Sequence, residues 1–398
     1  MASEWRTTTL GEVIELKRGY DLPSQDRREG PYPIVSSSGV SGCHAEAKAK
    51  APGVVIGRYG TLGEVHYITQ DYWPLNTSLY VRDFKGNDPK FISYFLRSLD
   101  FGAYSDKAAV PGLNRNDLHT AVVLVPPLAE QQRIAGILGA LDDKIELNRR
   151  MSQTLESMAR ALFKSWFVDF DPVRAKAEGL DPSLPTDPAE LFAKPFQDSQ
   201  LGEIPSGWRA STVGQEFRVT MGQSPPGETY NMDGAGVPFY QGRADFGNRF
   251  PSRRVYCTAP TRRALAADTL VCVRAPVGDT NQAWEDCAIG RGLAAVRHRS
   301  GATSYTYLAM RCLRDSFAAF EAGGTVFGAI GKDDLRDVPV VAPAAGVVVA
   351  FEEVAARLDD KVASAQAQLS SLMAVRDALL PVLVSGARMA ADSRTEGG

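Results

Sequence analysis

The chain has 398 residues, of which 44% are hydrophobic and 23% charged, with a formal net charge of −3. This length exceeds one ordinary domain, and the composition excludes a disordered or collagen-like chain. The five cysteines form no C-x-x-C pair, which excludes a disulfide framework and disfavours a zinc ribbon. No run approaches 18 apolar residues and no signal-peptide pattern opens the chain, so we expect no transmembrane helix and a cytoplasmic location.

The sequence predicts two globular parts. Apolar runs at 54–57 and 121–125, and again at 270–273 and 338–342, are typical of strands in a mixed α/β fold. Residues 171–200, rich in Pro, Asp and Ala, indicate a linker. We expect the tail at 387–398 to be disordered.

A long amphipathic helix is expected after each globular part. The apolar spacing of four and three residues predicts two helices that pair in a coiled coil. The seam positions are Ile134, Leu138, Leu141, Ile145, Leu155 and Leu162 in the first helix and Phe351, Leu358, Val362, Leu369, Leu372 and Leu379 in the second. Asn148 also falls on this stripe, either as a buried register-setting residue or at a solvated seam edge, and the second interpretation is slightly favoured.

The chain repeats itself with a period near half its length. Residues 141–145 (LDDKI) return 217 residues later as 358–362 (LDDKV), and Trp5-Arg6 returns 203 residues later as Trp208-Arg209. Between these anchors the copies diverge, although Arg58 before Gly63 can be matched to Arg274 before Gly278. The sequence therefore predicts an internal pseudo-twofold repeat whose helical parts agree better than its globular parts.

Four segments together resemble the specificity subunit of type I restriction-modification systems. They are 126–134 (PPLAEQQRI), 141–148 (LDDKIELN), 162–173 (LFKSWFVDFDPV) and 201–208 (LGEIPSGW). The resemblance covers essentially the whole chain. The second copy departs from the pattern at 347–351 (VVVAF), where the first has EQQRI, so the two helix starts are not expected to engage a partner identically.

The resemblance implies an α+β fold in which two similar mixed α/β target-recognition domains are separated by two long antiparallel helices that form a coiled-coil spacer. The implied segments are recognition domain 1 (1–125), helical spacer 1 (126–170), a linker (171–200), recognition domain 2 (201–342), helical spacer 2 (343–386) and the tail. Each recognition domain would bind one half of a bipartite, asymmetric sequence in double-stranded DNA, and the helices would fix the spacing.

The resemblance also implies partners. The helices would dock two methyltransferase (modification) subunits, which bring S-adenosylmethionine, and two restriction endonuclease/translocase subunits, which use ATP and Mg²⁺. The chain itself would be non-catalytic, with no cofactor and no metal. The alternatives are a free-standing DNA methyltransferase or nuclease and a coiled-coil scaffold without a role on DNA.

Catalytic motifs are not evident in the residues. Residues 224–227 (SPPG) lack the aromatic residue of an amino-methyltransferase motif and are interpreted as a turn. The glycine-rich loop 323–331, followed by Lys332, lacks P-loop spacing, and its role is open. Glu46 and Lys48 resemble the end of a nuclease metal site but are better explained as a surface charge pair.

The aromatic cluster Trp166, Phe167 and Phe170 could be core or a docking patch, whereas Trp5 and Trp208 are interpreted as core anchors.

Arginine is concentrated in the second half: residues 243–263 hold six arginines and one acid. The arginine guanidinium can form two parallel hydrogen bonds to a phosphate or to the edge of a guanine base. A solvated surface with scattered ion pairs would give a similar concentration of arginine in the sequence. The candidate DNA contacts are Arg58, Tyr59, Thr61, Lys107, Asn114 and Arg115 in the first half and Gln241, Arg243, Arg253, Arg254, Arg274 and Lys332 in the second.

Overall fold

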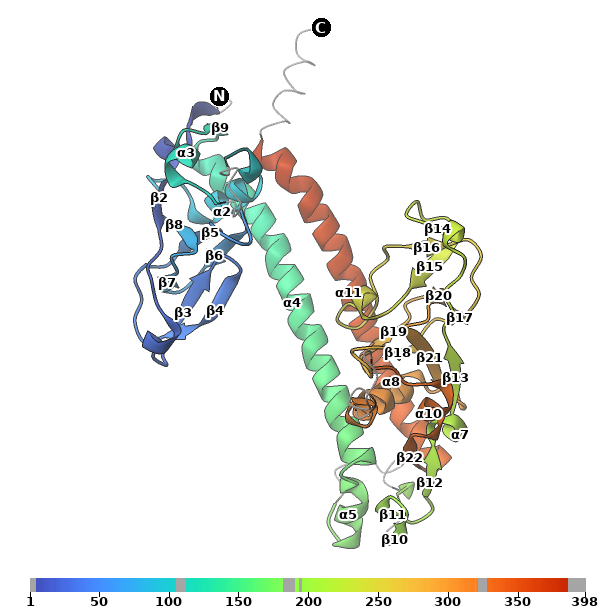
Figure 1. Cartoon of the computed structure of the whole chain (residues 1–398). Coiled ribbons are helices and arrows are strands. Elements are labelled where there is room, and N and C mark those ends of the chain that lie inside the picture. Colours follow the sequence, from blue (N-terminus) through green and yellow to red (C-terminus); the bar gives the residue numbers. More distant parts are fainter. Residues whose placement is uncertain are drawn as a thin grey trace. The chain divides into compact units, whose positions relative to one another are not determined.

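The structure is a computed structural model that describes residues 5–104, 112–181, 190–192, 195–318, 320 and 328–385. The chain divides into two compact units, residues 1–150 with 366–398 and residues 151–365. The two long helices, α4 (Leu128–Phe167) and α11 (Ala345–Val384), each contribute one end to each unit (Figure 1).

The first unit is built on an antiparallel sheet. Its strands lie in the order β2 (Glu15–Arg18), β8 (Ser78–Asp83), β5 (Gly53–Gly57) and β6 (Val65–Ile68). A second sheet has the order β4 (Gly39–His44), β3 (Tyr32–Ser36) and β7 (Trp73–Pro74), and β1 (Arg6–Thr9) pairs with β9 (Val122–Val125). The short helices are α1 (Leu10–Val13), η1 (Ser24–Asp26), α2 (Pro89–Arg97), η2 (Phe101–Tyr104) and α3 (Arg115–His119).

The second unit repeats the four-stranded sheet and the two-stranded pair of the first, while its remaining large sheet has five strands in place of three. Its four-stranded sheet has the order β13 (Phe217–Met221), β21 (Leu293–His298), β18 (Thr269–Cys272) and β19 (Thr280–Gln282), and β12 (Arg209–Thr212) pairs with β22 (Pro339–Ala342). A five-stranded sheet contains β14 (Tyr230–Asn231), β16 (Tyr256–Cys257), β15 (Val237–Tyr240), β20 (Cys287–Ile289) and β17 (Arg263–Ala264). The other elements are α5 (Asp171–Ala177), β10 (Phe196–Ser199), β11 (Gly202–Pro205), α7 (Val213–Glu216), η3 (Gly227–Thr229), η4 (Arg243–Asp245), α8 (Thr303–Cys312), α9 (Arg314–Ala318) and α10 (Lys332–Asp337).

The register of one strand pair accounts for both repeat offsets. Thr9 lies opposite Val122 in the first unit, and Thr212 lies opposite Pro339 in the second. Thr212 follows Thr9 by 203 residues and Pro339 follows Val122 by 217. The repeat seen in the sequence is therefore a repeat of structure, with length differences between the paired strands.

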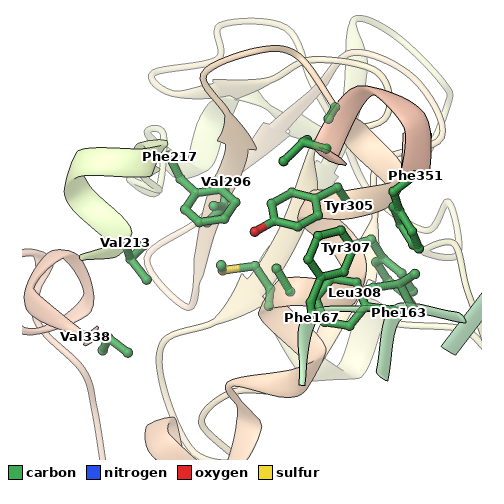
Figure 2. Packing of buried hydrophobic residues seen from close by; sticks show 14 of the residues in the cluster. Phe163, Phe167, Val213, Phe217, Val296, Tyr305, Tyr307, Leu308, Val338 and Phe351 are labelled. Carbon is green, nitrogen blue, oxygen red and sulfur yellow. The ribbon is translucent and has the colours of Figure 1, made fainter. Parts of the chain in front are cut away.

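Each unit has its own hydrophobic core, to which the long helices contribute. In the second unit the ring of Phe163 on α4 lies 5.7 Å from that of Phe351 on α11 in an edge-on arrangement, and both rings join the cluster drawn in Figure 2. Such aromatic pairs add about 0.5–1.5 kcal/mol beyond burial. Trp166, Phe167, Phe170 and Trp208 lie in the same core, which decides for core and against a docking patch, and Trp5 packs half-buried against the core of the first unit.

The helices pack together along the predicted seam. All twelve predicted seam residues are buried or half-buried. Within the first unit, Asp142 and Asn148 of α4 contact Arg376 and Gln368 of α11 respectively, so the two helices run antiparallel there. Asn148 is 1% exposed, and the preference for a solvated seam edge was wrong. Its Nδ2 faces Gln368 at 3.4 Å, while its Oδ1 has no hydrogen-bond partner among the described residues.

One described helix, α11, is long and apolar enough to cross a membrane by length and composition. The sequence was expected to have no such helix because it has no unbroken run of 18 apolar residues. A window of high mean hydropathy can include a few polar residues, so α11 meets this second criterion. It is weak evidence for a membrane span, because core helices of soluble proteins pass the same test. Both Phe351 and Ala355 of this helix are fully buried in the core of the second unit.

Candidate nucleic-acid interface

In the first unit the predicted loop 58–61 follows the buried strand β5. The chain turns back so tightly that a Cβ atom on Gly57 would lie 1.9 Å from the Thr61 carbonyl oxygen, so only glycine fits. The Arg58 guanidinium stacks on the Tyr59 ring at 4.6 Å, and Tyr59 remains 38% exposed. The loop therefore presents a cation and an aromatic face at one edge of the domain.

A second segment lies against this loop. Tyr59 forms an isolated antiparallel bridge with Gly112, and Arg58 Nε donates to the Leu113 carbonyl at 3.3 Å. Asn114 accepts from the Asn116 amide at 3.0 Å as the cap of α3, so it has a structural role at that helix start. Arg115 follows it, exposed. The structure thus brings loop 58–61 and residues 112–115 together, whereas Lys107 lies outside the described residues.

The second unit carries the same arrangement with different side chains. Arg274 bridges Ala329 as Tyr59 bridges Gly112. The amide of Gly278 donates to Cys272 as the amide of Gly63 donates to Gly57. Both Gly63 and Gly278 have positive φ values, +73° and +86°. The match of Arg58 to Arg274 is therefore wrong by one residue: Arg274 occupies the position of Tyr59.

The candidate contact residues of the second unit differ in whether an ion pair already holds their side chains. Arg243 pairs with Asp279 at 2.6 Å, Arg253 with Glu285 at 2.5 Å, and Arg254 with Asp245. Arg274 and Lys332 are exposed and have no ion pair within the described part of the chain. Gln241 is exposed, and its backbone amide donates to the Asp245 carboxylate. Of the glycine-rich loop 323–331, only 328–331 is described, and it leads directly into Lys332.

Residues outside the predicted interface hold the globular part of each unit on the long helices. Gln131 of α4 accepts from the Asp88 amide at 2.9 Å and donates to Asn87 at 2.7 Å, at the start of α2. In the second copy Val348 stands at the matching position, and Glu352 instead accepts from the amides of residues 303, 304 and 305 at the start of α8. The departure noted at 347–351 therefore moves the polar contact by about one helical turn.

The alternative chemical sites are not supported. Glu46 pairs with Arg28 at 2.5 Å on the surface, as expected of a charge pair. No cluster of three or more His, Cys, Asp or Glu side chains that could hold a metal lies among the described residues. All five cysteines are free.

Two copies of one mixed α/β domain, each presenting an exposed loop tip and each bound to a long helix, define a two-domain recognition protein. A family model described as type I restriction modification DNA specificity domain matches residues 2–157. This part of the chain matches the DNA specificity domain of type I restriction-modification systems, and the chain is similar to specificity subunits of these systems over three quarters of its length. The function that these similarities support is DNA target recognition within a restriction-modification complex, as a non-catalytic specificity subunit that carries no cofactor itself.

Individual proteins similar to this chain are also specificity subunits. A Methanocaldococcus jannaschii protein named "Putative type I restriction enzyme MjaX specificity subunit" is 29% identical over 308 residues, covering 75% of this chain and 68% of that protein. The HindI specificity subunit of Haemophilus influenzae is 24% identical over 362 residues, covering 75% and 77%. The crystal structure of an S subunit from M. genitalium matches with a TM-score of 0.67 at 17% identity over 96% of both chains, which shows the shared fold.

Proposed function

We propose that this chain reads a bipartite, asymmetric DNA sequence, one half with each recognition domain, while the paired helices fix the unread spacing. The observation that carries the proposal is the equivalence of Tyr59 and Arg274 at matching loop positions of two domains that share a four-stranded sheet and a two-stranded pair. One scaffold with different tips implies two different half-sites, and half-site spacing is a geometric property of the elements that join the two readers.

The proposed organisation keeps the boundaries expected from the sequence: recognition domains at 1–125 and 201–342, helical spacers at 126–170 and 343–386, and a linker at 171–200. The helices dock two methyltransferase subunits, which bring S-adenosylmethionine and methylate adenine. Two restriction subunits, which use ATP and Mg²⁺, join that core. The complex works in the cytoplasm on double-stranded DNA.

Candidate base contacts fall into two groups. Arg274 and Lys332 are exposed and unpaired within the described residues, so their cations are available to DNA without breaking an ion pair. Arg243, Arg253 and Arg254 would first have to leave Asp279, Glu285 and Asp245. A ready-made cation binds with less reorganisation, so Arg274 and Lys332 are the stronger candidates.

The test is methylome sequencing of a host that expresses this chain with its modification subunit. We expect an adenine-methylated bipartite motif that disappears when this chain is deleted, and the motif itself gives both half-sites and the spacer. Methylation by the purified chain alone would instead support a free-standing methyltransferase. Failure of the two subunits to associate, with no binding to DNA at any salt concentration, would support a scaffold.

A further inference from the structure

A cavity of about 600 Å³ lies in the second unit, beside the candidate interface. It is lined from one side by the C-terminal turns of α4 and from the other by the recognition domain. Its five cationic lining residues are Arg160, Lys164, Arg243, Arg311 and Arg314, and Asp279 is the one carboxylate among its described lining residues. We call this cavity the basic cleft.

The charges of the basic cleft are not balanced within the described residues. Asp279 is shared by Arg243 and Arg314, at 2.6 and 2.9 Å. Arg311 donates to the Tyr307 hydroxyl at 2.9 Å, and Arg160 donates to the Ser157 hydroxyl at 3.0 Å; both partners are neutral. Lys164 pairs with Asp169, which does not line the cleft. The cleft therefore carries an excess of positive charge that favours an anion.

The position of the cleft points to the anion. Residues 278–280 line it, and they directly follow the loop that carries Arg274. A duplex in contact with Arg274 would therefore continue past the cleft, and backbone phosphate is the anion that such a duplex supplies along its whole length. Arginine is well suited to it, because its planar fork binds phosphate through two hydrogen bonds.

The repeat makes the cleft specific to one half of the chain. At the offset of 217 that relates the two helices, Asp377 matches Arg160 and Pro381 matches Lys164. The helix that serves the first recognition domain thus carries an acid and a proline at these positions. A general feature of helix packing would be expected in both copies, whereas a contact made to DNA on one side need not be.

We propose that the basic cleft binds a backbone phosphate of the target DNA, next to the half-site read by the second recognition domain, with Arg160 and Lys164 of α4 as phosphate contacts. This inference rests on the proposed function and extends it. The spacer helix then has a second role, since it supplies affinity that does not depend on sequence in addition to setting the distance between the recognition domains.

The test is DNA binding by the full chain in complex with its methyltransferase subunit, measured by fluorescence anisotropy between 50 and 200 mM salt. The probes are a duplex carrying the motif and an unrelated duplex of the same length. Each lost phosphate contact lowers the salt slope by about 0.9. For the double variant Arg160→Gln, Lys164→Gln we expect the affinity lost across this salt range to shrink roughly tenfold, equally for both duplexes.

Two controls separate charge from structure. Arg149→Gln removes an exposed cation of the same helix that does not line the cleft, and it is expected to leave the slope unchanged. Arg160→Lys keeps the charge and is expected to keep most of the slope. Because both target side chains are exposed, the double variant should melt at the wild-type temperature.

The opposite results are equally clear. A wild-type salt slope in the double variant would overturn the proposal. Loss of the methyltransferase subunit with an unchanged slope would also overturn it and would assign the cleft to an acidic protein segment. If the wild-type complex shows no preference for any bipartite motif, the proposed function fails; if it shows one and only the slope prediction fails, the error lies with the cleft alone.

Discussion

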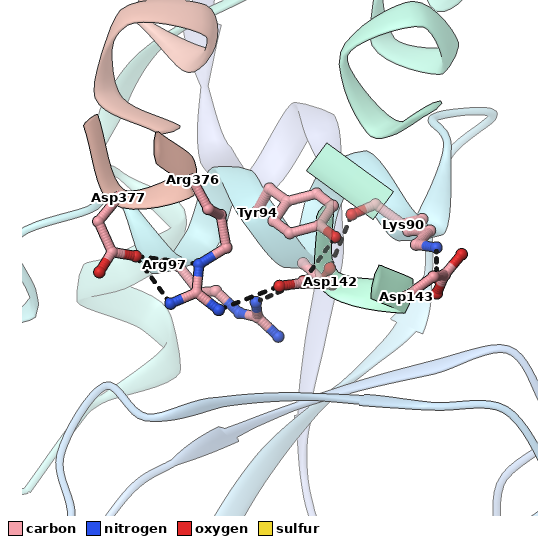
Figure 3. Close-up of polar contacts among 8 residues, drawn as sticks. Lys90, Tyr94, Arg97, Asp142, Asp143, Arg376 and Asp377 are labelled. Atoms are coloured by element: carbon pink, nitrogen blue, oxygen red, sulfur yellow. Dashed lines mark hydrogen bonds and ion pairs between the residues drawn. The ribbon is translucent and has the colours of Figure 1, made fainter. Parts of the chain in front are cut away.

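Asp142 on α4 accepts a hydrogen bond from Arg376 on α11 at 3.0 Å, which joins the two helices inside the first unit (Figure 3). Its other carboxylate oxygen accepts from the Tyr94 hydroxyl of α2 at 2.7 Å. One side chain thus fixes the helix pair and the recognition domain together. Burial by itself would raise the pKa of Asp142, but the hydrogen bonds from Tyr94 and Arg376 outweigh it and lower this pKa below its usual value.

Replacing this carboxylate should loosen the first unit. We expect Asp142→Ala to cost about 2 kcal/mol, because the Tyr94 hydroxyl and Arg376 lose a charged acceptor, and to lower the melting temperature by roughly 4–8 °C. The adjacent Asp143→Ala is a matched control. The Asp143 side chain is 79% exposed, and its ion pair with Lys90 is long, at 3.8 Å. The effect of this substitution should therefore stay within about 0.5 kcal/mol. Equal effects of the two variants would contradict the role assigned to Asp142.

The repeated motif performs a related task in the second unit with different partners. Asp359, which matches Asp142, pairs with Arg249 at 2.7 Å, and the Arg249 guanidinium stacks on the Tyr307 ring at 3.5 Å. Arg249 is 4% exposed. Burial raises the pKa of Asp359, and the positive charge of Arg249 opposes that change. A loop of the recognition domain is therefore anchored to α11 by a buried ion pair.

Breaking this pair should be more costly than breaking the first. Asp359→Ala leaves the Arg249 cation buried without its carboxylate, a change that typically costs about 3–5 kcal/mol. Asp360→Ala, the exposed neighbour, should be nearly neutral. Thermal melting of the two variants, followed by tryptophan fluorescence, checks the difference. A near-wild-type melting temperature for Asp359→Ala would show that Arg249 reaches solvent.

The helical seam could be predicted because its apolar spacing repeats over many turns, and all twelve predicted positions are at least half-buried. The repeat was also visible, since its anchors are short motifs of unusual composition. The loop register could not be read in the same way: Arg58 and Arg274 look equivalent in sequence, and only the bridges to Gly112 and Ala329 show the shift by one residue. The anchoring contacts of Gln131 and Glu352 join segments far apart in sequence, for which no local pattern exists.

Asn148 tests how the seam balances specificity against stability. The residue is buried with its Oδ1 unpaired within the described residues, an arrangement that costs free energy in a helical seam but can fix register. We expect Asn148→Leu to raise the melting temperature by a few degrees, because Gln368 is exposed and can turn to solvent. Asn148→Ala, which adds no apolar contact, should not. Destabilisation by Asn148→Leu would mean that a polar partner was overlooked.

His119 should make the first unit sensitive to mild acid. Its Nε2 accepts from the Leu16 amide at 2.9 Å, and burial, followed by the charges of Lys85 and Arg115, lowers its pKa. The folded chain therefore binds fewer protons at this site than the unfolded chain, whose histidine pKa is about 6.5. The stability contributed by the neutral ring is present above that value and is lost as the pH falls toward the lowered folded pKa.

The measurement is the melting temperature of wild type and His119→Gln between pH 7.5 and 5.5. Glutamine can still accept from Leu16 but does not titrate. We expect the wild type to lose more stability than the variant as the pH falls. His298, whose pKa burial also lowers, contributes equally to both proteins and cancels in the difference. Parallel curves would show that the His119 ring is not constrained to its neutral form.

Arg274 is the residue on which half-site recognition should depend most directly. It is exposed, unpaired within the described residues, and held at the loop tip by its bridge to Ala329. If it reads a base edge, Arg274→Ala should cost about 1–3 kcal/mol against duplexes with the correct second half-site and leave the first half-site preference unchanged.

Arg243→Ala should cost less in base discrimination, because its guanidinium is already held by Asp279. A loss that is uniform across unrelated sequences would make Arg274 a phosphate contact, and no loss would remove it from the interface. Tyr59, at the equivalent tip, should affect only the other half-site, so reciprocal effects of Tyr59→Ala and Arg274→Ala would link each domain to its own half of the target.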